Sequence, residues 1–187
     1  MIRTFLFLLF SFYLFFNAIP LKASVYDNDV LDIFSKLMPR FVLMSSSKNN
    51  LQDTIEICVL HDKIDERIAV SLIDKVDSNY PKGIKNYKIA LLNSDYSNLD
   101  ACQNSHLAFM FDTNNKNIDK TIKFSNKYTI LTMSYDAKYL EKGVNTSLFL
   151  GRKVTPYVNM NTIRKNGIEL DNVLLRISKI YTDEDGK

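Results

Sequence analysis

The sequence predicts one α/β domain, with a mainly parallel sheet flanked by helices and with a C-terminal β-hairpin and helix. Short apolar runs alternate with stretches whose apolar residues recur at helical spacing, and this alternation is typical of a parallel sheet. Residues 89–92 and 108–111 are apolar without interruption, as strands covered on both faces must be. The alternation ends near residue 143, where two apolar runs flank a short polar turn. At 187 residues, the chain is long enough to build one core without metals or many bridges.

Two helices and a strand are predicted in the first part of the chain. An apolar stripe predicts a first helix, which we expect Pro39 to end or kink because proline disfavours helix in the residue before it. This stripe consists of Val30, Ile33, Phe34, Leu37 and Met38. Residues 55–60 are short, apolar and β-branched, and they predict the first buried strand. A second stripe predicts another helix, with Asp62 or Asp65 capping its first turn. The second stripe consists of Ile64, Ile68, Ala69, Leu72, Ile73 and Val76.

The same pattern repeats through the middle of the chain. We expect strands over residues 87–92, 106–111 and 128–133. We expect helical segments over residues 98–103, 118–125 and 137–142. Strands that alternate with helices in this way pair in parallel, because each crossover helix returns the chain to the same end of the sheet.

The C-terminal part is predicted to begin with a hairpin of residues 144–150 and 154–158, in which Gly151 supplies a positive φ. Pro156 cannot donate to a strand ladder, so we expect the second strand at an edge. Asn159 or Asn161 is expected to cap a short helix that Gly167 ends. A last amphipathic helix should then dock on the sheet through Leu170, Val173, Leu174, Ile177 and Ile180.

Residues 1–23 are predicted to be a cleaved signal peptide, which leaves residues 24–187 as the domain. Arg3 is followed by an apolar stretch, and Ala23 is a small residue of the kind that signal peptidase favours. A retained anchor is the alternative, but the stretch is shorter than the roughly 20 residues of a membrane-spanning helix. Removal of Arg3 and Lys22 leaves 22 basic and 21 acidic residues, so the net charge falls from +3 to +1. This mixed surface argues against a nucleic-acid partner.

The two cysteines, Cys58 and Cys102, are expected to pair as a disulfide. A leader directs the chain to an oxidising compartment, where an even number of cysteines is normally paired. The alternative is two buried free thiols. A metal site is not expected, because the sequence has no Cys-x-x-Cys or His-x-x-x-His spacing.

Polar residues at predicted strand ends are the candidate binding residues. His61, Ser94 and Ser134 fall where open α/β sheets place small ligands, so they form a possible ligand edge. The plainer interpretation of His61 and Ser134 is that each precedes a helix-capping aspartate. The five glycines are isolated, so the sequence contains no phosphate or dinucleotide loop, and no Gly-x-Ser-x-Gly elbow surrounds Ser134. We therefore predict neither enzymatic activity nor a cofactor.

The order of these segments resembles the YfiR family, also called the domain of unknown function 4154 family. The resemblance covers about residues 30–181. It rests on the Ile-Cys-Val-Leu strand at 57–60, Cys102 followed by the 107–111 strand, and the Ile-Leu-Thr-Met-Ser strand at 130–134. It rests further on the Lys-Val-Thr-Pro-Tyr-Val-Asn segment at 153–159, the Arg-Lys-Asn-Gly-Ile-Glu-Leu segment at 164–170 and Leu-Leu-Arg-Ile at 174–177.

The resemblance implies a periplasmic regulator without chemistry of its own. Proteins similar to YfiR bind the periplasmic sensor domain of an inner-membrane diguanylate cyclase and hold its cytoplasmic domain inactive. Release raises cyclic di-GMP and promotes biofilm formation, and a sensor kinase is the partner of other members. We also hypothesise that the Cys58–Cys102 bridge holds the sheet in its binding-competent shape. A homodimer and a periplasmic small-ligand-binding module remain the alternatives to a membrane partner.

Overall fold

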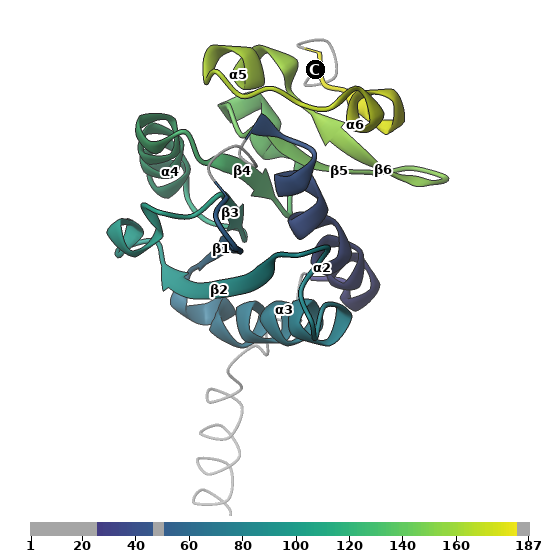
Figure 1. Cartoon of the computed structure of the whole chain (residues 1–187). Coiled ribbons are helices and arrows are strands. Elements are labelled where there is room, and N and C mark those ends of the chain that lie inside the picture. The colour runs from purple at the N-terminus through teal and green to yellow at the C-terminus, as the bar shows by residue number, and fades with distance from the viewer. Residues whose placement is uncertain (1–25, 47–50, 183–187) are drawn as a thin grey trace, which may run out of the picture.

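A computed structural model describes residues 26–46 and 51–182 (Figure 1). Its seven strands form one sheet in the order β2-β1-β3-β4-β5-β6-β7. The strands are β1 (Thr54–His61), β2 (Lys88–Asp95), β3 (Leu107–Met110), β4 (Leu131–Ser134), β5 (Thr146–Leu150), β6 (Val154–Val158) and β7 (Lys179–Ile180). Neighbouring strands are parallel except β5 and β6, which form an antiparallel hairpin. The predicted α/β class with a mainly parallel sheet is confirmed.

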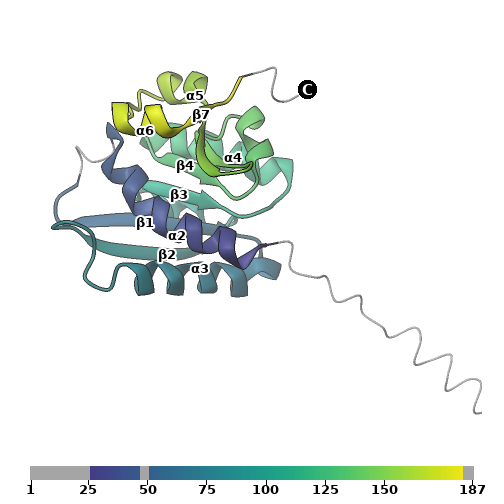
Figure 2. The ribbon, with the colours of Figure 1, turned by 90° about the vertical axis from the view of Figure 1, so that its right-hand side faces the viewer.

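Helices cover both faces of the sheet (Figure 2). The α-helices are α2 (Asn28–Leu43), α3 (Glu66–Asn79), α4 (Asn115–Tyr128), α5 (Met160–Lys165) and α6 (Asn172–Ile177). The 3-10 helices are η2 (Lys63–Asp65), η3 (Leu99–Cys102) and η4 (Ala137–Lys142). Alternate residues of each central strand point to opposite faces. In β3, Leu107 and Phe109 therefore join the core under α2 and α3, while Ala108 and Met110 join a second core under α4, η3 and η4.

A disulfide joins the two cysteines in the second core. Cys58 lies in the middle of β1 and Cys102 lies in η3, with a Cα–Cα distance of 5.6 Å and 44 residues between them in sequence. Both side chains are buried among apolar groups from β1, β3 and α4. The bridge therefore fixes the connection after β2 against the centre of the sheet.

A buried asparagine joins β4 to the hairpin. Asn145 Oδ1 accepts hydrogen bonds of 2.9 Å from both the backbone N–H and the hydroxyl of Thr132. Its Nδ2 donates to Thr162 Oγ1 over 3.3 Å. β4 and β5 pair only at Met133 and Thr146. These side-chain hydrogen bonds therefore supply much of the contact that holds β4 to the hairpin.

Replacing Asn145 with alanine is expected to lower the free energy of unfolding by about 2 kcal/mol, because the fully buried N–H of Thr132 loses its acceptor. Urea unfolding of the oxidised protein measures the change. Thr162→Val is the control, since it leaves both Thr132 contacts in place. It removes the outer bond of Asn145 together with the bonds of the Thr162 hydroxyl to the Asn159 and Val144 carbonyls, and it should cost about 1 kcal/mol. Equal effects of both substitutions would contradict the role of the Thr132 contact.

An end of the first helix at Pro39, one of the two outcomes expected there, is wrong, and so is the expected side-chain cap of the second helix. Pro39 does not end α2, which continues to Leu43. Proline removes one backbone bond, but Pro39 itself and the residues after it are buried, and this packing offsets the loss. Neither Asp62 nor Asp65 caps α3 through its side chain, because the carboxylate of Asp62 binds Thr113 instead.

The hairpin turn also differs from its prediction. Gly151 does not have a positive φ; a Cβ atom at this position would lie 2.7 Å from the Phe149 ring, so a larger residue here would require that ring to shift. The strand β6 is not at the edge throughout, because β7 pairs with Tyr157 and Val158. Pro156 lies beyond β7, where its missing N–H breaks no bond of the ladder.

The C-terminus forms a shorter helix than expected. The last helix, α6, ends at Ile177, and Ile180 lies in β7. Only Leu174 of the predicted stripe is fully buried, whereas Val173 and Ile177 are more than half exposed. The short α5 is as predicted: Asn159 caps it and Gly167 follows it with a φ of 65°. The predicted signal peptide lies outside the described residues, and no helix in the described part is both long and apolar enough to cross a membrane.

Candidate functional site at the carboxyl edge of the sheet

The three residues of the predicted ligand edge lie at the carboxyl ends of strands. His61 and Ser94 belong to neighbouring strands, whereas Ser134 ends β4, which is separated from β1 by β3. All three are buried. Their polar atoms contact carbonyl groups of the segments that follow: His61 Nδ1 lies 3.0 Å from the Asp62 oxygen, Ser94 Oγ donates to Asn98 over 3.0 Å, and Ser134 Oγ donates to Asp136 over 2.9 Å. These contacts stabilise turns, and a ligand role stays a prediction.

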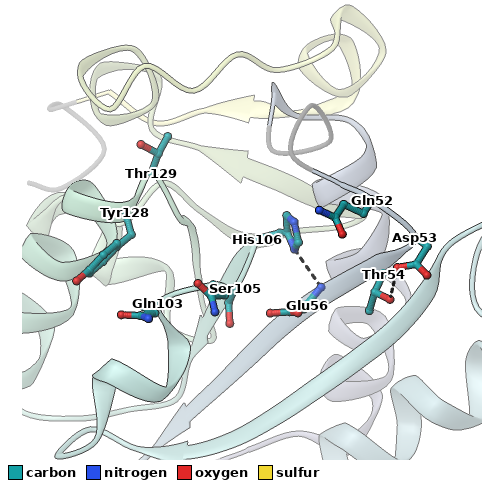
Figure 3. A pocket seen from close by; sticks show the side chains of 10 residues that line it. Gln52, Asp53, Thr54, Glu56, Gln103, Ser105, His106, Tyr128 and Thr129 are labelled. Atoms are coloured by element: carbon teal, nitrogen blue, oxygen red, sulfur yellow. Dashed lines mark hydrogen bonds between the residues drawn. The ribbon is translucent and has the colours of Figure 1, made fainter.

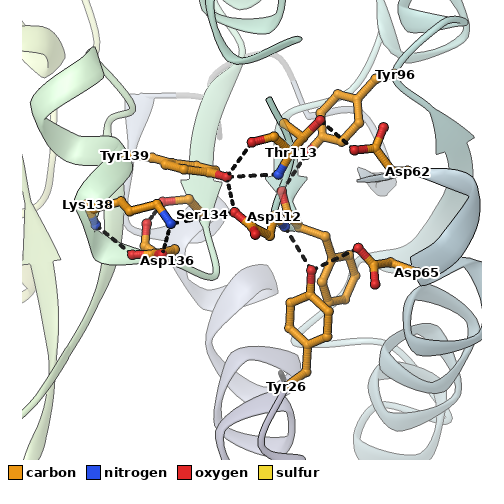
Figure 4. A network of polar contacts seen from close by, with 11 residues as sticks. Tyr26, Asp62, Asp65, Tyr96, Asp112, Thr113, Ser134, Asp136, Lys138 and Tyr139 are labelled. Carbon is orange, nitrogen blue, oxygen red and sulfur yellow. Dashed lines mark hydrogen bonds and ion pairs between the residues drawn. The ribbon is translucent and has the colours of Figure 1, made fainter. Parts of the chain in front are cut away.

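A network of tyrosines and carboxylates occupies the same edge (Figure 4). The hydroxyl of Tyr26 donates to Asp65 Oδ2 and accepts from the backbone N–H of Asp112, each over 3.0 Å. The N–H of Asp27 donates to the Tyr135 hydroxyl over 2.7 Å. The first described residues are therefore attached to the ends of β3 and β4.

Tyr139 is the centre of a second part of this network. Its hydroxyl donates to Asp112 Oδ1 and accepts from the N–H of Thr113 over 2.8 Å. The ammonium of Lys138 lies 2.7 Å from Asp136 Oδ2 and 3.7 Å from Asp112 Oδ1. Asp136 raises the pKa of Lys138 above its ordinary value through this hydrogen bond. The charges at this edge are thus largely paired with one another.

Asp62 links the network to α4. Its Oδ2 accepts from the Thr113 hydroxyl over 2.7 Å, and its Oδ1 accepts from Asn117 Nδ2 over 3.3 Å. This contact holds the segment after β1 against the start of α4. Asp62 was expected as a helix cap, but its carboxylate faces the neighbouring loop.

Burial raises the pKa values of Tyr26, Tyr96 and Tyr139 above their ordinary value near 10. The unfolded chain loses these protons near pH 10 while the folded protein keeps them. The contribution of these tyrosines to the free energy of unfolding is therefore expected to be constant below about pH 10 and to fall as the pH rises above it. Urea unfolding between pH 8 and 11 measures this slope. Tyr139→Phe should flatten the slope, and an unchanged slope in this variant would contradict the assignment.

A mainly apolar groove of about 330 Å³ opens beside the network. Tyr26 and Tyr135 line it together with the outer part of β5 and with three charged side chains. The lining residues are Tyr26, Asp112, Tyr135, Asp136, Ala137, Lys138, Leu148, Phe149 and Leu150. Its position between the strand ends and the hairpin makes it accessible to another chain.

A larger, polar pocket of about 500 Å³ lies at the opposite, amino edge of the sheet (Figure 3). Its lining residues are Gln52, Asp53, Thr54, Glu56, Gln103, Asn104, Ser105, His106, Tyr128 and Thr129. His106 Nδ1 accepts from the backbone N–H of Glu56 over 3.1 Å, so this histidine ties β3 to β1. None of the three predicted edge residues lines this pocket.

The chemistry of the carboxyl edge favours binding over catalysis. Its carboxylates are held by tyrosine hydroxyls, by Lys138 and by loop residues. Among the residues that the structure describes, no group of three His, Cys, Asp or Glu side chains could hold a metal ion. What the site offers a second molecule is shape, apolar surface and hydrogen bonds.

Sequence reasoning missed most of this network. Asp112 and Thr113 follow the predicted 106–111 strand directly, so the rule that drew attention to Ser134 could also have identified them. No pattern in the sequence identifies Tyr26, because its partners lie 39 and 86 residues away.

Two solved structures of bacterial proteins have the same fold. A conserved domain protein from Vibrio cholerae O1 biovar El Tor strain N16961 is 14% identical with a TM-score of 0.60, over 81% of this chain and 60% of that one. The ABC domain of Streptococcus pneumoniae in complex with L-Trp is 5% identical with a TM-score of 0.54, over 78% and 59%. The chain thus spans about 60% of the length of each, and likeness at these identities shows the fold alone.

No curated protein sequence matches the chain significantly. The family model described as YfiR/HmsC-like matches residues 37–179. This match includes β1 to β6 and both cysteines and ends at the first residue of β7, and it confirms the resemblance noted from the sequence. The chain therefore belongs to the YfiR/HmsC-like family, a family of periplasmic regulators rather than catalysts.

Proposed function

We propose that this protein inhibits an inner-membrane diguanylate cyclase, or a sensor kinase, by binding its periplasmic sensor domain. Binding keeps the cytoplasmic output domain inactive, lowers cyclic di-GMP and limits biofilm formation. The family match over residues 37–179 is the observation that carries the proposal. A leader removed near Ala23 delivers the chain to the periplasm, where the Cys58–Cys102 bridge is stable.

The surface of the C-terminal part supports a binding role. Large apolar side chains are exposed on the hairpin, on α6 and on β7, where their contact with water does not stabilise a folded monomer. They are Phe149, Leu150, Val154, Val173, Ile177 and Ile180. Contact with a partner would remove this surface from water, and a second copy of the chain is the competing partner.

In-cell cross-linking of the mature protein, followed by mass spectrometry, tests the proposal. We expect an inner-membrane protein with a periplasmic sensor domain and a cytoplasmic cyclase or kinase domain to be captured. Deleting the protein should raise cyclic di-GMP when the partner is a cyclase, and an active-site variant of that cyclase should abolish the rise. Capture of the protein alone, with unchanged cyclic di-GMP and unchanged kinase output, would overturn the proposal.

A periplasmic small-ligand-binding module is the second candidate. It is favoured by the 500 Å³ polar pocket and by the similar Streptococcus pneumoniae domain, which was solved with L-Trp. L-Trp is therefore the first probe, and a ligand at saturating concentration should raise the thermal midpoint. His106→Ala tests the amino-edge pocket and His61→Ala tests the predicted carboxyl edge. A midpoint that L-Trp does not move would remove the support that the Streptococcus pneumoniae domain gives.

A further inference from the structure

The outer part of β5 is an open strand edge. β4 ends at Ser134 and pairs with β5 only at Thr146, whereas β5 continues to Leu150. The tip of the β5–β6 hairpin accordingly projects beyond the neighbouring strands (Figure 1). In the described part of the chain, no strand pairs with residues 147–150 on the β4 side.

The hairpin ladder shows which backbone groups face this opening. The N–H of Asn159 donates to the Asn145 carbonyl over 2.9 Å, and hydrogen-bonded and non-bonded rungs alternate in an antiparallel pair. The rungs Leu148–Pro156 and Leu150–Val154 are therefore non-bonded. At these two rungs the β5 residues direct their N–H and C=O groups away from β6, toward the opening.

The apolar groove lies along this open edge. Leu148, Phe149 and Leu150 of β5 line it together with Tyr26 and Tyr135. Leu150 is 57% exposed, so the groove continues into the apolar tip of the hairpin. Aligned backbone groups beside an apolar hollow are what an added β-strand with one inserted side chain requires.

The charges of the residues that line the groove indicate which side chains the added strand carries. Asp112 and Asp136 carry two negative charges against the single positive charge of Lys138, so the lining has a net charge of −1. A basic residue next to the inserted apolar side chain complements this charge.

The geometry points to strand addition: the groove receives an extended segment of the membrane partner's periplasmic domain, which pairs with Leu148–Leu150 and carries an apolar side chain beside a lysine or arginine. The inference rests on the proposed function, because the membrane partner is the source of the segment. It adds to that proposal the place where the partner docks and the extended conformation of the partner's segment.

The first test places a photo-cross-linking amino acid at Leu150, or at the control position Val70 on α3, in the full chain in cells. Both side chains are exposed, 57% at Leu150 and 43% at Val70. We expect a periplasmic segment of an inner-membrane cyclase or kinase to be captured from Leu150 and not from Val70. Capture from Val70 alone would overturn strand addition and leave the regulator proposal intact. Capture of a second copy from Leu150 would also overturn it, and capture from neither position with unchanged cyclic di-GMP and kinase output would remove both proposals.

The second test removes one backbone donor. Leu150→Pro deletes an N–H that faces the groove, whereas Val154→Pro deletes an N–H on the same rung that faces the opposite side of the hairpin. Neither substitution removes a bond of the β5–β6 ladder. We expect Leu150→Pro to weaken partner binding roughly tenfold and Val154→Pro to leave it unchanged, with urea unfolding used to confirm that both variants are folded. Equal binding by both folded variants would overturn the inference.

Discussion

Replacing Cys58 and Cys102 together with serine is expected to lower the free energy of unfolding by at least about 4 kcal/mol. The bridge closes a loop with a sequence separation of 44 residues, and loss of this closure raises the entropy of the unfolded chain by about that amount. Both sulfurs are also buried in the second core, so each new hydroxyl loses its contact with water. Urea unfolding of the oxidised wild-type protein and of the double variant measures the difference.

The double alanine variant separates the two causes. It lacks the bridge but introduces no buried hydroxyl, so the difference between the serine and alanine variants gives the cost of the hydroxyl groups. If the bridge keeps the sheet in its binding-competent shape, partner binding should weaken in both variants. A serine variant with undiminished stability and undiminished partner binding would reject the structural role of the bridge.

Phe109→Ala is expected to lower the free energy of unfolding by about 4 kcal/mol. The Phe109 side chain is fully buried in β3, and its ring centroid lies 5.0 Å from that of Phe34 and 5.1 Å from that of Phe111. Truncation removes these edge contacts and leaves a cavity between α2 and the sheet. Since small domains are stable by about 5–15 kcal/mol, this loss is a large fraction of the total.

Phe109→Leu is the matched control for this cavity. Leucine fills most of the space and should cost less than half as much as alanine. The measurement is again the urea midpoint and slope, with near-ultraviolet circular dichroism to follow aromatic packing. A cost that is similar for leucine and alanine would indicate that the ring contacts, rather than the cavity, carry the stability.

The arrangement of the sheet could be predicted because its signals are local. The apolar runs of β1 and β3 are buried on both faces, and β1 shows the reason most clearly: Ile57 and Val59 face one core, while Cys58 and Leu60 face the other. The prediction is wrong for residues 89–92, because β2 is an edge strand and its Leu92 is exposed. The errors lie where tertiary contacts outweigh local preference. Pro39 remains inside α2 because its surroundings are buried, and Ile180 leaves the predicted helix because a strand position beside Val158 is open to it.

The candidate site was less predictable because its groups meet across long distances in sequence. The predicted residues His61, Ser94 and Ser134 are at the carboxyl edge, as their positions after apolar runs required. The groove depends instead on the length of β5 relative to β4 and on a tyrosine at the start of the domain. Neither strand length nor a contact 86 residues apart has a signature in a single sequence.

The attachment of the first described residues to the sheet affects the order in which the domain can assemble. Tyr26 and Asp27 bind groups that lie 86 and 108 residues later, whereas the cysteines are separated by 44. Contacts of large sequence separation form late, so α2 is expected to lock in place after the central strands have paired. Until then the faces of β1 and β3 that α2 covers remain open to water. A folding chain is therefore most prone to aggregation through these strands in the interval before its own first helix closes over them.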